Sequence, residues 1–146
     1  MKKILEMVNR LSWSSYGIGI TPTSSIRQFA VASYLVAEKL KSWLDDKNLI
    51  LEEYKKPMFK DHNKGKDLIV NWAKEMKLDY KKEIDIGVET ADVLLYADDI
   101  GIFEVGTIPP LRLFLLLKMV IKMDKPMSLH FWPYFDKNAY VFKNWY

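Results

Sequence analysis

The stretch ADVLLYADDIGIFEVGT, residues 91–107, decides how the fold of this chain is interpreted. Two short apolar runs, residues 93–96 and 102–105, flank the polar pair Asp98-Asp99. Short apolar runs separated by turn-forming residues are typical of β-strands joined in a hairpin. Aspartate is common in turns because its side chain bonds to nearby backbone groups. The stretch therefore predicts a hairpin whose turn lies at the two aspartates.

Two further carboxylates lie in the predicted strands. Asp92 opens the first strand, and Glu104 interrupts the second strand where an apolar residue is expected. With the turn at residues 98–99, Asp92 and Glu104 stand nearly opposite each other, within cross-strand contact range. Two carboxylates at that separation repel unless a cation lies between them. The pair therefore predicts a divalent-metal site, and the alternative is that both side chains lie on a solvated face.

The residues before the hairpin predict two helices and two strands. Ser25 and Gln28 match a capping box, which opens an amphipathic helix ending near residues 43–45. The following pattern predicts a strand over residues 49–54, a polar loop over 60–66, a helix over 67–77 and a strand of alternating polarity over 80–89. Residues 1–24 form an irregular lead-in, because glycine and proline interrupt any long helix there.

The residues after the hairpin predict one more helix and one more strand. Residues 111–123 follow Pro109-Pro110 and are apolar on most sides, which is typical of a helix buried against a sheet. Residues 127–132 predict a strand, and the aromatic tail 133–146 either folds back as a last strand or packs on the surface. The sequence therefore predicts a single α/β (α+β) domain, 1–146, with a small mixed central sheet flanked by helices.

Composition narrows the chemistry that the chain can carry. The absence of cysteine excludes disulfides, thiolate metal sites and cysteine nucleophiles. With only two histidines, carboxylates are the plentiful metal ligands, so Mg²⁺ or Mn²⁺ is the expected ion. No signal peptide or membrane-spanning run is evident in the sequence, which favours a cytoplasmic protein.

Basic and aromatic side chains gather in two parts of the sequence. A net charge of +3 permits nucleic-acid binding without requiring it. One group surrounds the predicted central loop and the other decorates the tail: Lys55, Lys56, Lys60, Lys64 and Lys66, then Lys137, Lys143, Trp145 and Tyr146. These residues could contact phosphates and stack on unpaired bases, or they could be soluble surface and, in the tail, core or a dimer interface.

The predicted elements over residues 67–132, together with Asp92 and Glu104, resemble the core of the PD-(D/E)XK nuclease superfamily. The resemblance implies a restriction-endonuclease-like α-β-β-β-α-β core. It also implies that Asp92 and Glu104 hold Mg²⁺ or Mn²⁺ and that the protein hydrolyses phosphodiester bonds in DNA.

The sequence departs from the superfamily pattern at Gly106, where a lysine is expected two residues after Glu104. Such a lysine helps to position the attacking water and to stabilise developing charge. One interpretation is that another element supplies this lysine, with Lys118, Lys122 or Lys82 as candidates. The other is that the site is degenerate and only binds.

Many members of the superfamily also carry a glutamate on the helix before the sheet. Glu38 and Glu75 could each take that part, according to which helix belongs to the core. The alternative for either residue is a solvated position on a helix surface.

A second resemblance involves the predicted turn. Residues 95–100, Leu-Tyr-Ala-Asp-Asp-Ile, look like the Tyr-X-Asp-Asp hairpin of reverse transcriptases. The chain is short for such a polymerase, and its earlier metal-binding signature is not visible. Asp98 and Asp99 are therefore predicted to form a turn without catalysis.

Three hypotheses for function follow from these patterns. The preferred one is a metal-dependent nuclease that acts on DNA through Asp92 and Glu104. The second is a non-catalytic nucleic-acid-binding or assembly module with a degenerate nuclease-like fold, and Gly106 is the observation that favours it. The third is a purely structural homodimer formed through the aromatic tail.

Overall fold

The computed structural model describes residues 39, 41–46, 49–86, 90–106 and 110–145. Residues 39 and 41–45 are helical, and the rest of the helix predicted from Ser25, with Glu38 and the 1–24 lead-in, lies outside the described residues. The elements that follow are β1 (Ile50–Lys55), α3 (His62–Glu75), β2 (Asp79–Asp85), β3 (Thr90–Tyr96), β4 (Ile100–Gly106), α4 (Pro110–Lys122), β5 (Met127–Pro133) and β6 (Asn138–Lys143).

The strands form a six-stranded mixed sheet in the order β1-β6-β5-β4-β3-β2. Strands β4 and β5 are parallel, and the other neighbouring pairs are antiparallel. A parallel pair needs a crossover connection, which here is α4. The predicted hairpin is confirmed, since β3 and β4 are antiparallel neighbours on either side of residues 97–99.

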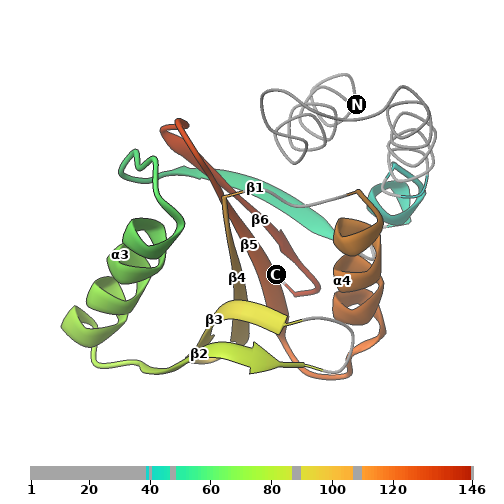
Figure 1. Cartoon of the computed structure of the whole chain (residues 1–146). Coiled ribbons are helices and arrows are strands. Elements are labelled where there is room, and N and C mark those ends of the chain that lie inside the picture. Colours follow the sequence, from blue (N-terminus) through green and yellow to red (C-terminus); the bar gives the residue numbers. More distant parts are fainter. Residues whose placement is uncertain (1–38, 40, 47–48, 87–89, 107–109, 146) are drawn as a thin grey trace.

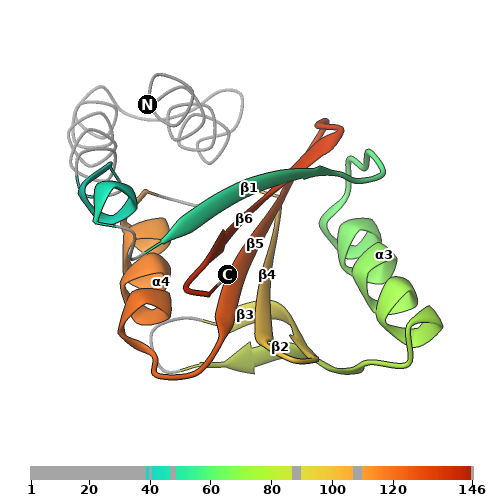
Figure 2. The same ribbon diagram turned by 180° about the vertical axis from the view of Figure 1, so that it is seen from behind.

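The two helices α3 and α4 lie on opposite faces of this sheet (Figures 1 and 2). Alternate residues of β3 and β4 face each helix, because successive side chains in a strand point to opposite faces. The α3 side buries Ile69, Val70, Ala73, Val93, Leu95, Phe103 and Val105. The α4 side buries Leu113, Leu116, Leu117, Val120, Leu94, Ile102 and Leu129. The predicted mixed α/β fold with a flanked sheet is confirmed.

The prediction of a loop over residues 60–66 was wrong. Helix α3 begins at His62, and the Asp61 side chain caps it by accepting hydrogen bonds from the amides of Asn63 (2.7 Å) and Lys64 (3.2 Å). The polar Asn63 and Lys64 and the small Gly65 look loop-like in sequence, but a cap by aspartate satisfies the backbone donors of this first turn. Asp67, the first residue of the predicted helix, therefore lies inside the observed one.

The aromatic tail forms a strand inside the sheet and does not pack on its surface. β6 pairs with β1 on one side and β5 on the other. Its residues Ala139, Tyr140, Val141 and Phe142 are buried, so the tail completes the core. The turn before it exposes Phe135.

Among the residues that the structure describes, no helix is long and apolar enough to cross a membrane.

Candidate functional site

Asp92 and Glu104 lie at opposed positions where β3 and β4 separate. The last paired residues of the two strands are Val93 and Phe103, so Asp92 and Glu104 occupy the next positions along. The amide of Val105 donates to Asp92 Oδ2 at 2.8 Å. In a continued ladder that amide would bond to the backbone of β3. The Asp92 carboxylate thus replaces a backbone acceptor and lies close to the plane of the sheet.

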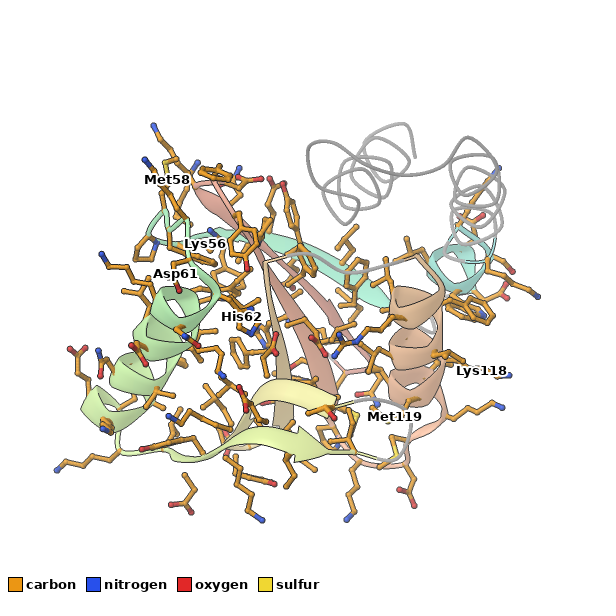
Figure 3. The ribbon with its side chains drawn as sticks, viewed as in Figure 1. Lys56, Met58, Asp61, His62, Lys118 and Met119 are labelled. Atoms are coloured by element: carbon orange, nitrogen blue, oxygen red, sulfur yellow. The ribbon has the colours of Figure 1, made fainter. Side chains whose placement is uncertain are left out.

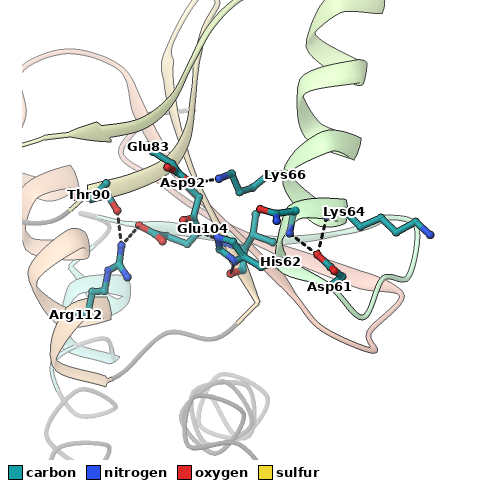
Figure 4. Close-up of polar contacts among 11 residues, drawn as sticks. Asp61, His62, Lys64, Lys66, Glu83, Thr90, Asp92, Glu104 and Arg112 are labelled. Carbon is teal, nitrogen blue, oxygen red and sulfur yellow. Dashed lines mark hydrogen bonds and ion pairs between the residues drawn. The ribbon is translucent and has the colours of Figure 1, made fainter.

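His62, the first residue of α3, bridges two oxygen atoms of this site. Its Nε2 lies 3.3 Å from Asp92 Oδ1, and its Nδ1 lies 3.1 Å from the carbonyl oxygen of Val105. Because Asp92 in turn accepts from the amide of Val105, the three residues form a closed ring of polar contacts (Figure 4). The imidazole is 41% exposed, so one side of the ring is open to solvent.

Glu104 is buried and forms an ion pair with a cation of α4, which lies on the other face of the sheet from His62 and α3. Only 1% of its side chain is exposed, and its Oε1 lies 3.1 Å from Arg112 Nη2 on α4. The same nitrogen donates to the carbonyl oxygen of Thr90 at 2.6 Å. A buried carboxylate needs such a partner because desolvation is costly for an isolated charge. Glu104 and Asp92 therefore have partners on different helices, Arg112 of α4 and His62 of α3.

Lys66 of α3 places a second cation, besides Arg112, near this site. Its side chain is only 9% exposed, and its Nζ forms an ion pair with Glu83 of β2 (Figure 4). The hydrogen bond and charge of Lys66 lower the pKa of the Glu83 carboxyl. Glu83 has a φ of 49°, in the left-handed region. It interrupts the β2–β3 pairing at the position facing Asp92, between the pairs Lys82–Val93 and Ile84–Ala91.

Gly106 cannot carry the lysine that the superfamily pattern expects. Its φ of 97° is rarely adopted by residues with a side chain, and a Cβ there would lie 2.6 Å from the Tyr134 hydroxyl oxygen. Burial, together with the negative charges of Asp61 and Asp92, raises the pKa of the Tyr134 phenol. A protonated phenol therefore occupies the place beside Asp92 where a side chain at residue 106 would extend.

The other predicted catalytic residues that the structure describes are exposed side chains of α4, β2 and α3. Lys118 is exposed on the outer side of α4 and points away from the sheet (Figure 3). Lys122 and Lys82 are also exposed, and Glu75 is exposed at the C-terminal end of α3, whereas His62 lies at its N-terminal end.

The lysines of the central segment have divided roles. Lys56 is buried: its Nζ donates to the carbonyl oxygen of Asp136 and lies 4.5 Å from the centre of the Phe59 ring. Desolvation lowers the pKa of this ammonium group, and the nearby charge of Asp136 opposes the shift. Lys55, Lys60 and Lys64 are exposed. The basic cluster seen in the sequence is thus only in part a surface.

The sequence patterns did not place four residues at this site, namely His62, Lys66, Arg112 and Tyr134. The aspartate before His62 was the available signal, because a cap at Asp61 places both His62 and Lys66 in one helix. The positions of Arg112 beside Glu104 and of Tyr134 beside Gly106 depend instead on how α4 and the turn after β5 pack.

The oxygen atoms available to a metal ion are the Asp92 and Glu104 carboxylates and the Val105 carbonyl. Such hard donors suit Mg²⁺ or Mn²⁺. In the part of the chain that is described, no group of three or more histidine, aspartate or glutamate side chains is arranged to hold a metal ion. An ion bound between Asp92 Oδ1 and the Val105 carbonyl oxygen would take the place of the His62 imidazole.

No protein-family model, no curated protein and no solved structure matches this chain.

Proposed function

We propose that this protein is a divalent-metal-dependent nuclease that hydrolyses phosphodiester bonds, with DNA as the preferred substrate. The observation that carries the proposal is the position of His62 between Asp92 Oδ1 and the Val105 carbonyl oxygen, next to the buried Glu104. The two oxygen atoms that hold the His62 imidazole between them also suit a small, hard cation. His62 is half-exposed and could move aside when such an ion binds.

The residues around the carboxylates supply the remaining groups that phosphodiester hydrolysis requires. When bound, the metal ion would polarise a phosphoryl oxygen and lower the pKa of a bound water. Asp92 and Glu104 would hold the ion. Lys66 is paired with Glu83, which occupies the position of β2 facing Asp92. In this proposal Lys66 takes the part of the missing lysine, in place of Lys118. Cationic groups at a developing phosphoryl charge are an effective source of transition-state stabilisation.

The runner-up is a non-catalytic nucleic-acid-binding or assembly module. It is favoured by the ion pair between Glu104 and Arg112, which already neutralises the buried carboxylate without a metal. In that case Arg112 and Lys66 stabilise the fold, and Asp92 orients His62.

A metal titration combined with a cleavage assay separates the two proposals. For the nuclease, Mn²⁺ should raise the melting temperature of the wild type, and the wild type should cut DNA when Mg²⁺ or Mn²⁺ is present. Asp92→Asn and Glu104→Gln should lose both effects. Asp98→Asn is the matched control, because Asp98 is exposed in the β3–β4 turn and outside the site. DNA binding without metal stabilisation or cleavage would favour the module.

The position of the supporting lysine has its own comparison. Lys66→Met should reduce cleavage by about 100-fold or more, the scale seen when one transition-state donor is removed. Lys118→Met should leave cleavage unchanged, since Lys118 points away from the sheet. The opposite result would return the role to Lys118.

A further inference from the structure

A cavity of about 300 Å³ lies at the turn end of the β3–β4 hairpin, away from Asp92 and Glu104 at the other end of these strands. Its aromatic walls are Tyr54, Trp72, Phe103 and Trp145, and Asp99 and His130 are among its polar groups. All of these side chains belong to described residues. Volumes of this size, with mostly apolar walls and a few polar groups, are typical of small-molecule sites.

One side of the cavity is fixed by a directed chain of hydrogen bonds. The indole of Trp132 can only donate, and it donates to Tyr54 Oη at 2.8 Å. Tyr54 Oη lies 2.8 Å from His130 Nδ1. An ionised carboxylate can only accept, so Ser128 Oγ donates to Asp99 Oδ2 at 2.7 Å. His130 Nε2 then donates to Ser128 Oγ at 3.0 Å.

Because Nε2 donates, a neutral imidazole carries its hydrogen on that nitrogen, and Nδ1 accepts from the Tyr54 hydroxyl. Burial lowers the pKa of His130 to about 4, with the charge of Asp99 opposing the shift, so the ring is neutral near pH 7. The ring also stacks on Phe103 at a centroid distance of 4.1 Å. Ser128 is 1% exposed, and its proton is bonded to Asp99. Ser128 and His130 therefore form a fixed wall rather than a nucleophile and its base.

In this series of hydrogen bonds the neighbouring donors are all bonded, and one oxygen of Asp99 can still accept. Ser128 and the Trp145 indole nitrogen (3.2 Å) both donate to Oδ2, whereas no side chain or amide within the described part of the chain donates to Oδ1. A carboxylate oxygen has two lone pairs, so Oδ1 can accept two further hydrogen bonds. The remaining cation of the cavity, Lys143, is paired with Glu52 at 2.9 Å.

These features define the chemistry of a matching ligand. Aromatic walls favour a flat ring, because rings stack on π-faces. A free carboxylate oxygen favours a ring edge with neighbouring N–H donors. Two carboxylates, Glu52 and Asp99, against one ammonium disfavour a negatively charged group inside the cavity.

We propose that this cavity binds a guanine base, which presents a ring N–H and an amino N–H side by side to Asp99 Oδ1 and stacks on Trp72. The base could come from a free nucleoside or from an unpaired nucleotide of a strand. This site is separate from the carboxylates of the proposed nuclease, so either proposal can fail without the other.

Tryptophan fluorescence of the full chain, titrated with guanosine, tests the proposal. Guanosine should quench the emission with saturation, and adenosine, which lacks the ring N–H, should bind at least tenfold more weakly. Inosine, which lacks the amino group, should fall between them. A single-stranded oligonucleotide with one guanine, compared with the same strand carrying adenine, tests the second source of the base.

Two variants locate the binding. Asp99→Asn keeps an oxygen for Ser128 and Trp145 but turns an amide donor toward the ligand, so guanine affinity should fall at least tenfold. Asp98→Asn, at the exposed neighbouring turn position, should bind like the wild type. Trp72→Ala removes a half-exposed wall residue and should also weaken binding. The proposal is overturned if neither guanosine nor the guanine strand binds, or if Asp99→Asn binds both as tightly as the wild type.

Discussion

The hydroxyl group of Tyr134 occupies the space into which a side chain at Gly106 would extend. A Cβ at residue 106 would lie 2.6 Å from the Tyr134 oxygen, and the backbone there has a φ of 97°. The glycine that interrupts the nuclease-like sequence pattern thus has a local structural cause. It permits β4 to end beside the turn that follows β5.

Gly106→Ala should destabilise the protein by about 1–3 kcal/mol or more, because it combines a disfavoured backbone conformation with a steric overlap. The free energy of unfolding in urea measures the loss. Gly101→Ala is the control, since Gly101 has no positive φ and a Cβ there would meet its nearest atom at 3.1 Å. Equal losses at the two positions would contradict the role assigned to Tyr134 and the backbone.

Asp61→Ala should cost about 1 kcal/mol of stability, the usual effect of removing a helix cap. Its carboxylate accepts from two amides in the first turn of α3. Asp67→Ala should change stability by less than about 0.5 kcal/mol, because Asp67 is exposed in the body of the same helix and alanine is a good helix former. Urea unfolding of both variants checks the difference, and a larger effect at Asp67 would contradict the observed helix start.

Arg112→Met should destabilise the protein by about 3 kcal/mol, because it leaves the buried Glu104 without its ion-pair partner while keeping an apolar stem. Adding Glu104→Gln should recover part of that loss, giving a coupling energy of about 1 kcal/mol or more in a double-mutant cycle. Lys118→Met on the same helix is the control and should be close to neutral. Additive effects of the two substitutions would show that the pair is not coupled.

The stability of the protein should depend on pH through His130. Its pKa is about 4 in the folded protein against an ordinary value of 6.5, so the unfolded chain binds more protons between these values. The contribution of the neutral ring is present above pH 6.5 and is lost as the pH falls toward 4, by on the order of 3 kcal/mol.

Urea midpoints of the wild type and of a variant without the ring, measured from pH 7 to pH 4, check this dependence. Other titrating groups contribute equally to both proteins, so the difference between the two curves reports on His130. His130→Gln removes the titrating ring and should flatten the curve relative to the wild type in that window. Parallel curves for the two proteins would contradict a neutral, buried His130.

The sequence by itself determined the mixed α/β fold and the opposed positions of Asp92 and Glu104. Those features depend on short-range patterns: the apolar periodicity of the strands, the turn chemistry of Asp98-Asp99 and the proline that opens α4. It missed the start of α3, because a single capping side chain outweighed a loop-like composition.

Only the tertiary structure decided which groups surround the carboxylates. His62 of α3 contacts Asp92 and Arg112 of α4 contacts Glu104, and these helices lie on opposite faces of the sheet. The sequence pattern of a single element does not encode how close two such elements lie. Tertiary structure also decided the series of hydrogen bonds from Tyr54 through His130 to Asp99, which joins β1, β5 and the β3–β4 turn. Residues far apart in sequence become partners because packing brings them together.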